Sequence, residues 1–359
     1  MSTSRTLVTR SLTAACALLL PLPLAHAQAA STPPTDAQLL SQLDQDMAGV
    51  ILLYDAIKGT PVVYLSGADA RQQFAPEDAA KILARGFGSA NQPTQLGKVT
   101  DGVTIPGRDG NQIPIRIYTP AGNGPFPVIT YYHGGGFVIA TIDTYDASAR
   151  ALAKYANAIV VSVEYRKAPE APYPAALHDA IDAYTWVTGN IGTYNGTATK
   201  VAVAGESAGG NLATEVAIAA RDEKLQRPTH QLLVYPVISS NVNQPSDTLY
   251  TSSQLPLNTP ALNYFYAQYS SASQANDPGV SPINANLSNL PPTTIIAAQE
   301  DPLQSDGQAY AAKLQAAGNQ VVYQLYTGTT HEFFGMGDVV GKAKQAEQFG
   351  ASRIAASFQ

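Results

Sequence analysis

Short apolar, β-branched runs alternate with helical stretches over most of this chain, from about residue 98 to its end. The runs that we expect to form strands are Val99–Ile105, Ile113–Tyr118, Val128–Tyr132, Ile159–Val163, Val201–Ala204, Leu232–Ile238, Thr294–Ala298 and Val321–Tyr326. Helical apolar spacing occurs at Ala147–Tyr155, Ala175–Val187 and Ala208–Ala220, and at about 305–317 and 339–357. Apolar strands separated by helices are typical of a mostly parallel sheet with helices on both faces. The sequence therefore predicts an α/β domain over residues 98–359, built on an eight-stranded sheet.

Two segments depart from this alternation. Residues 28–97 have helical apolar spacing at Leu39–Leu53 and again from Pro76 to Leu83, and they show no strand-rich pattern. Residues 240–290, inside the α/β domain, are rich in Asn, Ser and Gln, with scattered Tyr. An insert of that length beside a packed sheet is more often a lid or a binding element than a disordered loop.

The first 27 residues are typical of a secretory signal peptide. Arg5 and Arg10 make the start positive, and Leu12–Leu24 is an apolar stretch. Ala25-His26-Ala27 then offers the small-residue pattern that precedes cleavage, here before Gln28. The alternative is a buried N-terminal helix. We expect export to the periplasm or the medium.

Cysteine content and charge exclude several classes of function. Cys16 is the only cysteine and leaves with the predicted signal peptide, so the mature chain has no disulfide, thiol nucleophile or cysteine metal site. The net charge of −6 becomes −8 when Arg5 and Arg10 are removed. We expect no nucleic-acid partner, because such a partner would need clustered Lys and Arg. We also expect no stable membrane insertion, because that would need a longer uninterrupted apolar run. We expect a small-molecule substrate, and a homodimer is left open.

A glycine-flanked serine stands between an expected strand and an expected helix. The sequence Gly205-Glu206-Ser207-Ala208-Gly209-Gly210 fits the G-x-S-x-G pattern, in which a nucleophile occupies a tight strand-to-helix turn. At the start of the helix, free N–H groups favour a developing negative charge beside Ser207. The competing interpretation is a helix N-cap serine after a glycine turn.

A second glycine motif, His133-Gly134-Gly135-Gly136, follows directly on the run Val128–Tyr132. Glycines after a strand let backbone N–H groups turn toward a ligand, as an oxyanion hole requires, and lipases and esterases use an HGGG loop in this way. The alternative is a simple glycine turn. We expect His133 to hold the loop rather than to act as a base.

The general base is found by elimination among five histidines. His26 lies in the signal peptide, His133 in the glycine loop, His178 inside an expected helix and His230 just before an expected strand. His331 lies in a loop directly after the last strand, which is where open parallel sheets place their sites. We therefore predict His331 as the base.

The acid that orients this base is expected on the loop after the preceding strand. Glu300 and Asp301 both follow Thr294–Ala298. Asp301 is preferred because Pro302 stiffens its backbone and because it lies further past the strand end, whereas Glu300 stays an alternative. The resulting order of serine, aspartate and histidine is that of α/β-hydrolases.

Together these motifs resemble the bacterial esterases that are similar to mammalian hormone-sensitive lipase. Beside HGGG and GESAGG, the stretch Tyr165–Ala176 (YRKAPEAPYPAA) is similar to that family's YRLAPE and PAA sequences, and DPL at Asp301–Leu303 with Asp306-Gly307 and Tyr310 is similar to its DPL…DEG…Y segment. The similarity runs from about residue 98 to the end, apart from part of the insert. It implies an α/β-hydrolase fold, a Ser207, Asp301 and His331 triad, and oxyanion donors at Gly135, Gly136 and Ala208. It also implies a helical cap formed by residues 28–97 and the insert.

This chain departs from the family at two positions near the predicted triad. Many members have Asp where this chain has Glu206, and the residue after the catalytic histidine is often small where this chain has Glu332. Both departures could change the shape of the pocket and the acyl preference.

The predicted function is hydrolysis of short-to-medium acyl esters by a serine carboxylesterase, through an acyl-enzyme and without a metal or organic cofactor. A serine amidase or peptidase would use the same residues. A non-catalytic binding protein on the same scaffold is the alternative from another class.

Overall fold

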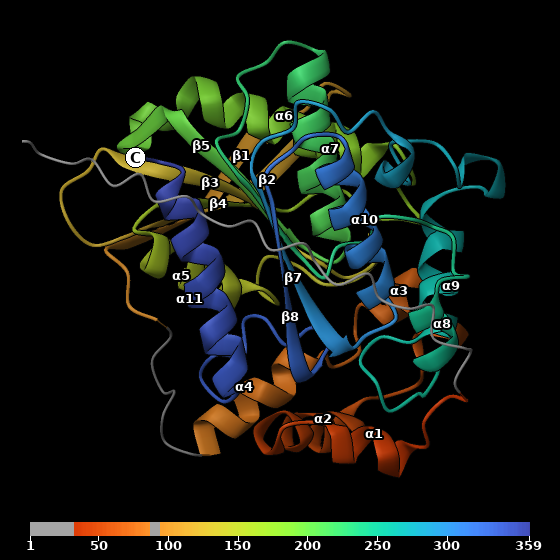
Figure 1. Cartoon of the computed structure of the whole chain (residues 1–359). Coiled ribbons are helices and arrows are strands. Elements are labelled where there is room, and N and C mark those ends of the chain that lie inside the picture. The colour runs from red at the N-terminus through yellow and green to blue at the C-terminus, as the bar shows by residue number, and fades with distance from the viewer. Residues whose placement is uncertain (1–31, 87–93) are drawn as a thin grey trace, which may run out of the picture. The chain divides into compact units, whose positions relative to one another are not determined.

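The eight runs predicted as strands form one sheet in the computed structural model of the protein, which describes residues 32–86 and 94–359 (Figure 1). The strands are β1 (Lys98–Pro106), β2 (Gln112–Thr119), β3 (Phe126–Tyr132), β4 (Ile159–Val163), β5 (Gly196–Glu206), β6 (Gln231–Val234), β7 (Thr293–Glu300) and β8 (Val321–Thr330). Their order in the sheet is β1-β2-β4-β3-β5-β6-β7-β8. The pairs from β4 through β8 are parallel, while β1 with β2 and β2 with β4 are antiparallel. The predicted fold class is confirmed, and the predicted signal peptide lies outside the described residues.

One predicted strand is too long. The run Leu232–Ile238 was expected to be extended throughout, yet β6 ends at Val234. Tyr235 has φ of +34°, and Pro236 has no N–H to continue the hydrogen-bonded ladder. Val237 and Ile238 remain buried in the turn that follows, so their apolar character reflects burial outside a strand.

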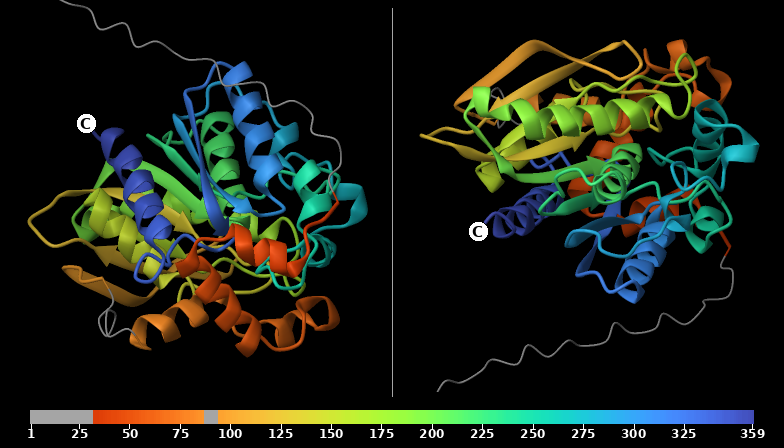
Figure 2. Two further views of the ribbon diagram at one scale, coloured as in Figure 1. Left: turned by 60° about the horizontal axis from the view of Figure 1, so that its bottom comes forward. Right: turned by 90° about the horizontal axis from the view of Figure 1, so that it is seen from above.

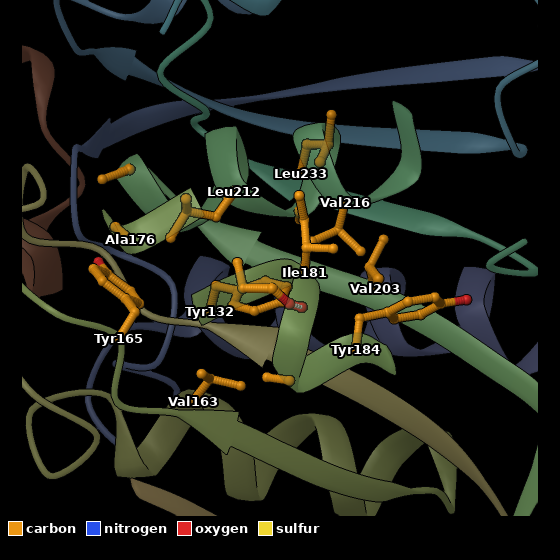
Figure 3. Packing of buried hydrophobic residues seen from close by; sticks show 14 of the residues in the cluster. Tyr132, Val163, Tyr165, Ala176, Ile181, Tyr184, Val203, Leu212, Val216 and Leu233 are labelled. Carbon is orange, nitrogen blue, oxygen red and sulfur yellow. Dashed lines mark hydrogen bonds between the residues drawn. The ribbon is translucent and has the colours of Figure 1, made fainter. Parts of the chain in front are cut away.

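Side chains alternate along the central strands and form two cores, one on each face of the sheet. On β3, Val128 and Tyr132 face one core while Ile129 and Tyr131 face the other. Because successive residues of a strand point to opposite faces, a strand covered on both faces must be apolar at nearly every position. Figure 3 shows the first of these cores, in which Tyr132, Val203 and Leu233 meet side chains of the covering helices.

Helices cover both faces. The core that includes Tyr132 contains residues of α6 (Ala175–Asn190), α7 (Ala208–Asp222) and α10 (Gln304–Ala316). The opposite core contains residues of α5 (Asp146–Ala156) and α11 (Gly341–Ala356). A short 3-10 helix, η2 (Ile191–Tyr194), leads from α6 into β5.

The described part of the segment before the sheet contains several helices. It contains α1 (Asp36–Gln42), α2 (Gln45–Ile57), η1 (Val62–Tyr64), α3 (Gly67–Ala70) and α4 (Pro76–Gly86). Thr35 begins α1 with a capping box, and Ser66 caps α3. By length and composition alone, Gln45–Tyr64 could cross a membrane. In the structure this stretch consists of two separate helices, and Met47, Val50 and Ile51 lie in the core that includes α5 and α11.

The insert after β6 contains α8 (Pro245–Leu249), α9 (Thr259–Tyr269), η3 (Ala272–Gln274) and η4 (Pro282–Asn284). It contacts the N-terminal helices, since the Tyr264 hydroxyl donates to the Leu65 carbonyl at 3.1 Å and Lys58 Nζ donates to the Ser253 carbonyl at 2.5 Å. Figures 1 and 2 show α1, α2 and α4 at the end of the sheet toward which β7 and β8 point. The N-terminal helices and the insert therefore lie at the carboxyl ends of these strands.

Arg71 fastens the N-terminal helices to the α/β domain. Its guanidinium donates to the carbonyls of Val138 and Ala168, each at 2.7 Å. It also forms a bidentate ion pair with Glu170. Two of these acceptors are backbone oxygens in loops that follow β3 and β4. The position of the N-terminal helices is thus linked directly to the loops around the glycine motif.

Candidate active site

Ser207 lies on a strained turn between β5 and α7. Its φ and ψ are +54° and −118°, and its N–H donates to the Val234 carbonyl at 2.9 Å on the neighbouring strand. A non-glycine residue with positive φ is uncommon, and such strain is concentrated at functional sites. Gly209 permits the turn to pass close to β3, because a Cβ there would lie 2.0 Å from the Tyr132 carbonyl oxygen. The serine motif thus forms the turn expected from its sequence.

Ser207, His331 and Asp301 are brought together in the order that their spacing suggested. His331 directly follows β8, and its Nε2 lies 3.0 Å from Ser207 Oγ. Its Nδ1 lies 2.7 Å from Asp301 Oδ2, and the Leu303 N–H donates to the other Asp301 oxygen at 2.8 Å. All three side chains are at least 96% buried. A serine hydroxyl beside a buried imidazole, itself oriented by a carboxylate, is the arrangement of an activated nucleophile.

Glu300, the alternative acid, does not reach His331. It is the last residue of β7, and its carboxyl is buried away from the imidazole. Burial raises the pKa of Glu300 to about 7, which is expected of a carboxyl held in an apolar environment. The structure therefore brings only Asp301 of the two adjacent carboxylates to the histidine.

The electrostatic environment of His331 favours its charged form. Burial lowers the pKa of His331, but the charge and hydrogen bond of Asp301 raise it, and Glu332 and Glu206 add to this effect. The net pKa of His331 lies above its usual value. The site therefore stabilises the imidazolium that forms when His331 takes a proton.

The HGGG loop supplies unpaired backbone donors beside Ser207. Gly135 and Gly136 have φ of +97° and +59°, a conformation that turns successive N–H groups away from the strand. Throughout residues 32–86 and 94–359, the N–H groups of Gly135, Gly136 and Ala208 find no backbone or side-chain acceptor. Donors left free in this way are what an oxyanion hole requires.

The remaining described histidines lie outside this arrangement. His133 is fully buried and stacks on Tyr165 with ring centroids 4.4 Å apart, and burial lowers its pKa to about 4. His230 bonds to Thr294 at 3.0 Å, and burial lowers its pKa to about 4. His178 pairs with Asp109 at the surface, at 3.1 Å. These contacts agree with the expectation that all three belong to the scaffold.

Glu206, the first departure from the family pattern, lies directly before the Ser207 turn. Its carboxylate is fully buried and accepts hydrogen bonds from the hydroxyls of Tyr131 and Tyr235. Burial raises the pKa of Glu206 to about 8, although both tyrosines oppose this shift. The ring of Tyr235 also lies 4.5 Å from that of His331. Glu206 therefore connects the strand that precedes Ser207 to residues that pack against the base.

Glu332, the second departure, enters the site itself. Its backbone has φ of +67°, which costs a side-chain-bearing residue roughly 1–2 kcal/mol. Its Oε2 accepts a hydrogen bond from the Tyr145 hydroxyl at 2.5 Å, and its Oε1 lies 3.7 Å from His331 Nε2. A second carboxylate thus lies on the side of the imidazole opposite Asp301.

Sequence reasoning missed two residues that support Glu332. Tyr145 is the residue before α5, and Glu77 comes from the first turn of α4, in a segment without recognisable motifs. Burial raises the pKa of Glu77 well above its usual value, and the charge of Glu332 raises it further. Their distance in sequence from His331 left no local signal by which either could have been found.

Ser207 and His331 line a cavity of about 580 Å³, within the size range of small-ligand sites, while Asp301 is buried behind the imidazole. Its floor includes Ser207, His331 and the glycine loop. Its walls come from the N-terminal helices and the insert, with Tyr54, Val62, Tyr64, Phe74, Leu257 and Phe265. Apolar walls around a few convergent polar groups suit an uncharged organic substrate. In the part of the chain that the structure describes, no group of three or more His, Cys, Asp or Glu side chains could hold a metal ion.

Comparison with known proteins agrees with this geometry. A family model described as the alpha/beta hydrolase fold matches residues 129–335. The chain is 33% identical over 314 residues to the ethyl acetate hydrolase of Pseudomonas putida. The matched region covers 84% of this chain and 95% of that protein. It is 39% identical over 255 residues to the carboxylesterase NlhH of Mycobacterium tuberculosis, with 69% and 80% covered. Among solved structures, the Pyrobaculum calidifontis esterase has a TM-score of 0.78 and 36% identity, covering 88% of this chain and 98% of that one.

Proposed function

Since this chain belongs to the α/β-hydrolase fold family and is a carboxylesterase, we propose that it hydrolyses short-to-medium acyl esters with Ser207, His331 and Asp301. One observation carries the residue assignment. Ser207 Oγ lies 3.0 Å from His331 Nε2, and His331 Nδ1 lies 2.7 Å from Asp301 Oδ2, so a continuous chain of hydrogen bonds runs from the cavity lining to the buried aspartate.

In the first half of the reaction, Ser207 Oγ attacks the ester carbonyl carbon while His331 Nε2 takes the hydroxyl proton. Asp301 accepts the Nδ1 proton in a hydrogen bond and stabilises the imidazolium. The negative oxygen of the tetrahedral intermediate accepts hydrogen bonds from the free N–H groups of Gly135, Gly136 and Ala208. The carbon–oxygen bond to the alcohol then breaks, and the leaving oxygen takes the proton from His331.

In the second half, water attacks the acyl-enzyme with His331 again as base, which releases the acid and restores Ser207. The substrate range is supported by the size of the cavity, about 580 Å³. The relative in Pseudomonas putida is named for ethyl acetate, a small ester. The N-terminal helices and the insert would then act as the cap over the acyl and alcohol groups.

The test is a series of p-nitrophenyl esters, from acetyl to palmitoyl, assayed with the unmodified enzyme and with Ser207→Ala. Short and medium acyl chains should give the highest kcat/KM, and the variant should lose turnover and form no acyl-enzyme detectable by mass spectrometry. Equal turnover in Ser207→Ala would refute the nucleophile. A preference for long emulsified chains would refute the substrate range, and turnover of p-nitroanilides without ester turnover would favour an amidase.

We also propose that the chain is exported after cleavage before Gln28. The support is the order of Arg5 and Arg10, the apolar stretch and Ala25-His26-Ala27. Expression of the full chain with intact-mass measurement of cell fractions tests this. A mature product that begins at Gln28 outside the cytoplasm is expected, and an uncut cytoplasmic chain would refute it.

A further inference from the structure

We propose that Glu332 is a further catalytic residue, which accepts a hydrogen bond from the water that attacks the acyl-enzyme. The proposal rests on the function proposed above for Ser207 and His331. A water molecule has two hydrogens, and His331 Nε2 can receive only one of them. The second hydrogen needs an acceptor on the same side of the imidazole.

The distance between the two acceptors fits one shared water. Glu332 Oε1 lies 3.7 Å from His331 Nε2, which is too far for a direct hydrogen bond. A water oxygen at about 2.8 Å from each atom can bond to both. Ser207, His331 and Glu332 all line the same cavity, so such a water lies where the acyl carbon on Ser207 Oγ can be reached.

The position of the Glu332 carboxylate is held by its surroundings. The Tyr145 hydroxyl donates to Oε2 at 2.5 Å, so Oε1 is the oxygen turned toward the imidazole. Tyr145 is itself buried and packs on the glycine loop, where its hydroxyl fills the space that a Gly134 side chain would occupy. The positive φ of Glu332 would favour glycine at this position. A glutamate kept there at a conformational cost indicates that its side chain contributes to the site.

Glu77 adds to this arrangement from the N-terminal helices. Its carboxyl is buried in the same cavity wall, and burial together with the charge of Glu332 raises its pKa and favours its protonated form. A neutral Glu77 adds no second negative charge beside Glu332 and leaves lone pairs of the Glu332 carboxylate free for water.

Water adds to the acyl-enzyme at its carbonyl carbon. The water oxygen forms a bond to the acyl carbon, the carbonyl π pair moves onto the oxygen held by the N–H donors, and one water proton goes to His331 Nε2. The second hydrogen stays on the new hydroxyl group and is hydrogen bonded to Glu332 Oε1. When the intermediate collapses, the bond from the carbon to Ser207 Oγ breaks, and Oγ takes the proton back from His331. The product is the carboxylic acid, and Glu332 is unchanged.

Methanol provides a direct comparison with water, because its hydroxyl carries one hydrogen. Both nucleophiles need His331, but only water has a second hydrogen for Glu332. Loss of the Glu332 acceptor should therefore slow hydrolysis of the acyl-enzyme more than methanolysis. A residue that only positions His331 would slow both reactions equally.

The experiment uses p-nitrophenyl acetate with a fixed amount of methanol and measures the ratio of methyl acetate to acetate formed. In Glu332→Gln, the Tyr145 hydroxyl retains an oxygen acceptor at the Oε2 position, which directs the new NH₂ group toward Nε2 and replaces the acceptor with a donor. We expect the product ratio to rise about tenfold, as for the loss of one charged hydrogen bond in a transition state. Glu332→Gly, which suits the positive φ, should shift the ratio in the same direction.

Glu206→Gln is the matched control, since Glu206 is a buried glutamate near the triad whose two oxygens accept from Tyr131 and Tyr235. Its product ratio should equal that of the unmodified enzyme. An unchanged ratio in both folded Glu332 variants, or an equal rise in Glu206→Gln, would overturn the proposal. Failure of the Ser207 mechanism is seen separately, as an acyl-enzyme that does not form.

Discussion

Replacement of Asp301 by Asn tests how much the buried carboxylate contributes to the reaction. Asp301 Oδ2 lies 2.7 Å from His331 Nδ1, and both side chains are at least 99% buried. Two opposite unit charges centred about 4 Å apart interact by about 4 kcal/mol at an effective dielectric constant of about 20. The charge on His331 develops only as Ser207 is deprotonated, so this stabilisation belongs to the transition state. At about 1.4 kcal/mol for each factor of ten, Asp301→Asn should lower kcat/KM about 10³-fold.

Glu300→Gln is the control for this measurement. Glu300 is the adjacent carboxyl, similarly buried, and makes no hydrogen bond to His331. Its replacement should leave kcat/KM for p-nitrophenyl butyrate within about threefold of the unmodified value, as expected away from the reacting groups. A loss of less than about tenfold in kcat/KM by folded Asp301→Asn, or an equal loss by Glu300→Gln, would refute this role of Asp301.

Three further outcomes are expected. Because only neutral His331 can accept the Ser207 proton, its raised pKa means that kcat/KM should fall on acidification with a midpoint above pH 6.5. A midpoint well below pH 6.5 in a pH–rate profile would contradict this. Gly209→Ala should destabilise the protein by about 3 kcal/mol in urea titrations. Gly189→Ala, in open space on α6, should change stability by less than about 1 kcal/mol. Similar values for the two variants would refute the close approach of Gly209 to β3. Arg71→Ala should lower the free energy of unfolding by about 2–4 kcal/mol, because two hydrogen bonds to carbonyls are lost. Glu170→Gln should lower it by less than about 1 kcal/mol, because that carboxylate is exposed. The reverse order would show that the ion pair dominates.

The sheet and the triad could be predicted because each rests on a local pattern. Apolar β-branched runs identify buried strands, and Ser207, Asp301 and His331 each lie within a few residues of a strand end. Their contact then follows from parallel strands that end at one edge of the sheet. The end of β6 was harder, because Tyr235 and Pro236 turn the chain while the apolar pattern continues.

The surroundings of the triad could not be predicted in the same way. Glu332 stood out as a departure, but its neighbours Tyr145 and Glu77 lie 187 and 255 positions earlier in the chain. Such contacts depend on how the helices pack over the sheet. Neither α4 nor the start of α5 carries a sequence pattern that specifies that packing.

The cavity walls come from distant parts of the chain, and this bears on when the protein becomes active during synthesis. The N-terminal helices leave the ribosome first, yet the cavity that they help to line also needs residues 255–266 and His331, which are made much later. Ser207 itself precedes its base by 124 residues. A nascent chain that has completed α7 therefore carries the serine turn without a base to activate it. Ester hydrolysis should begin only once β8 has joined the sheet, so no shorter intermediate of translation can attack cellular esters.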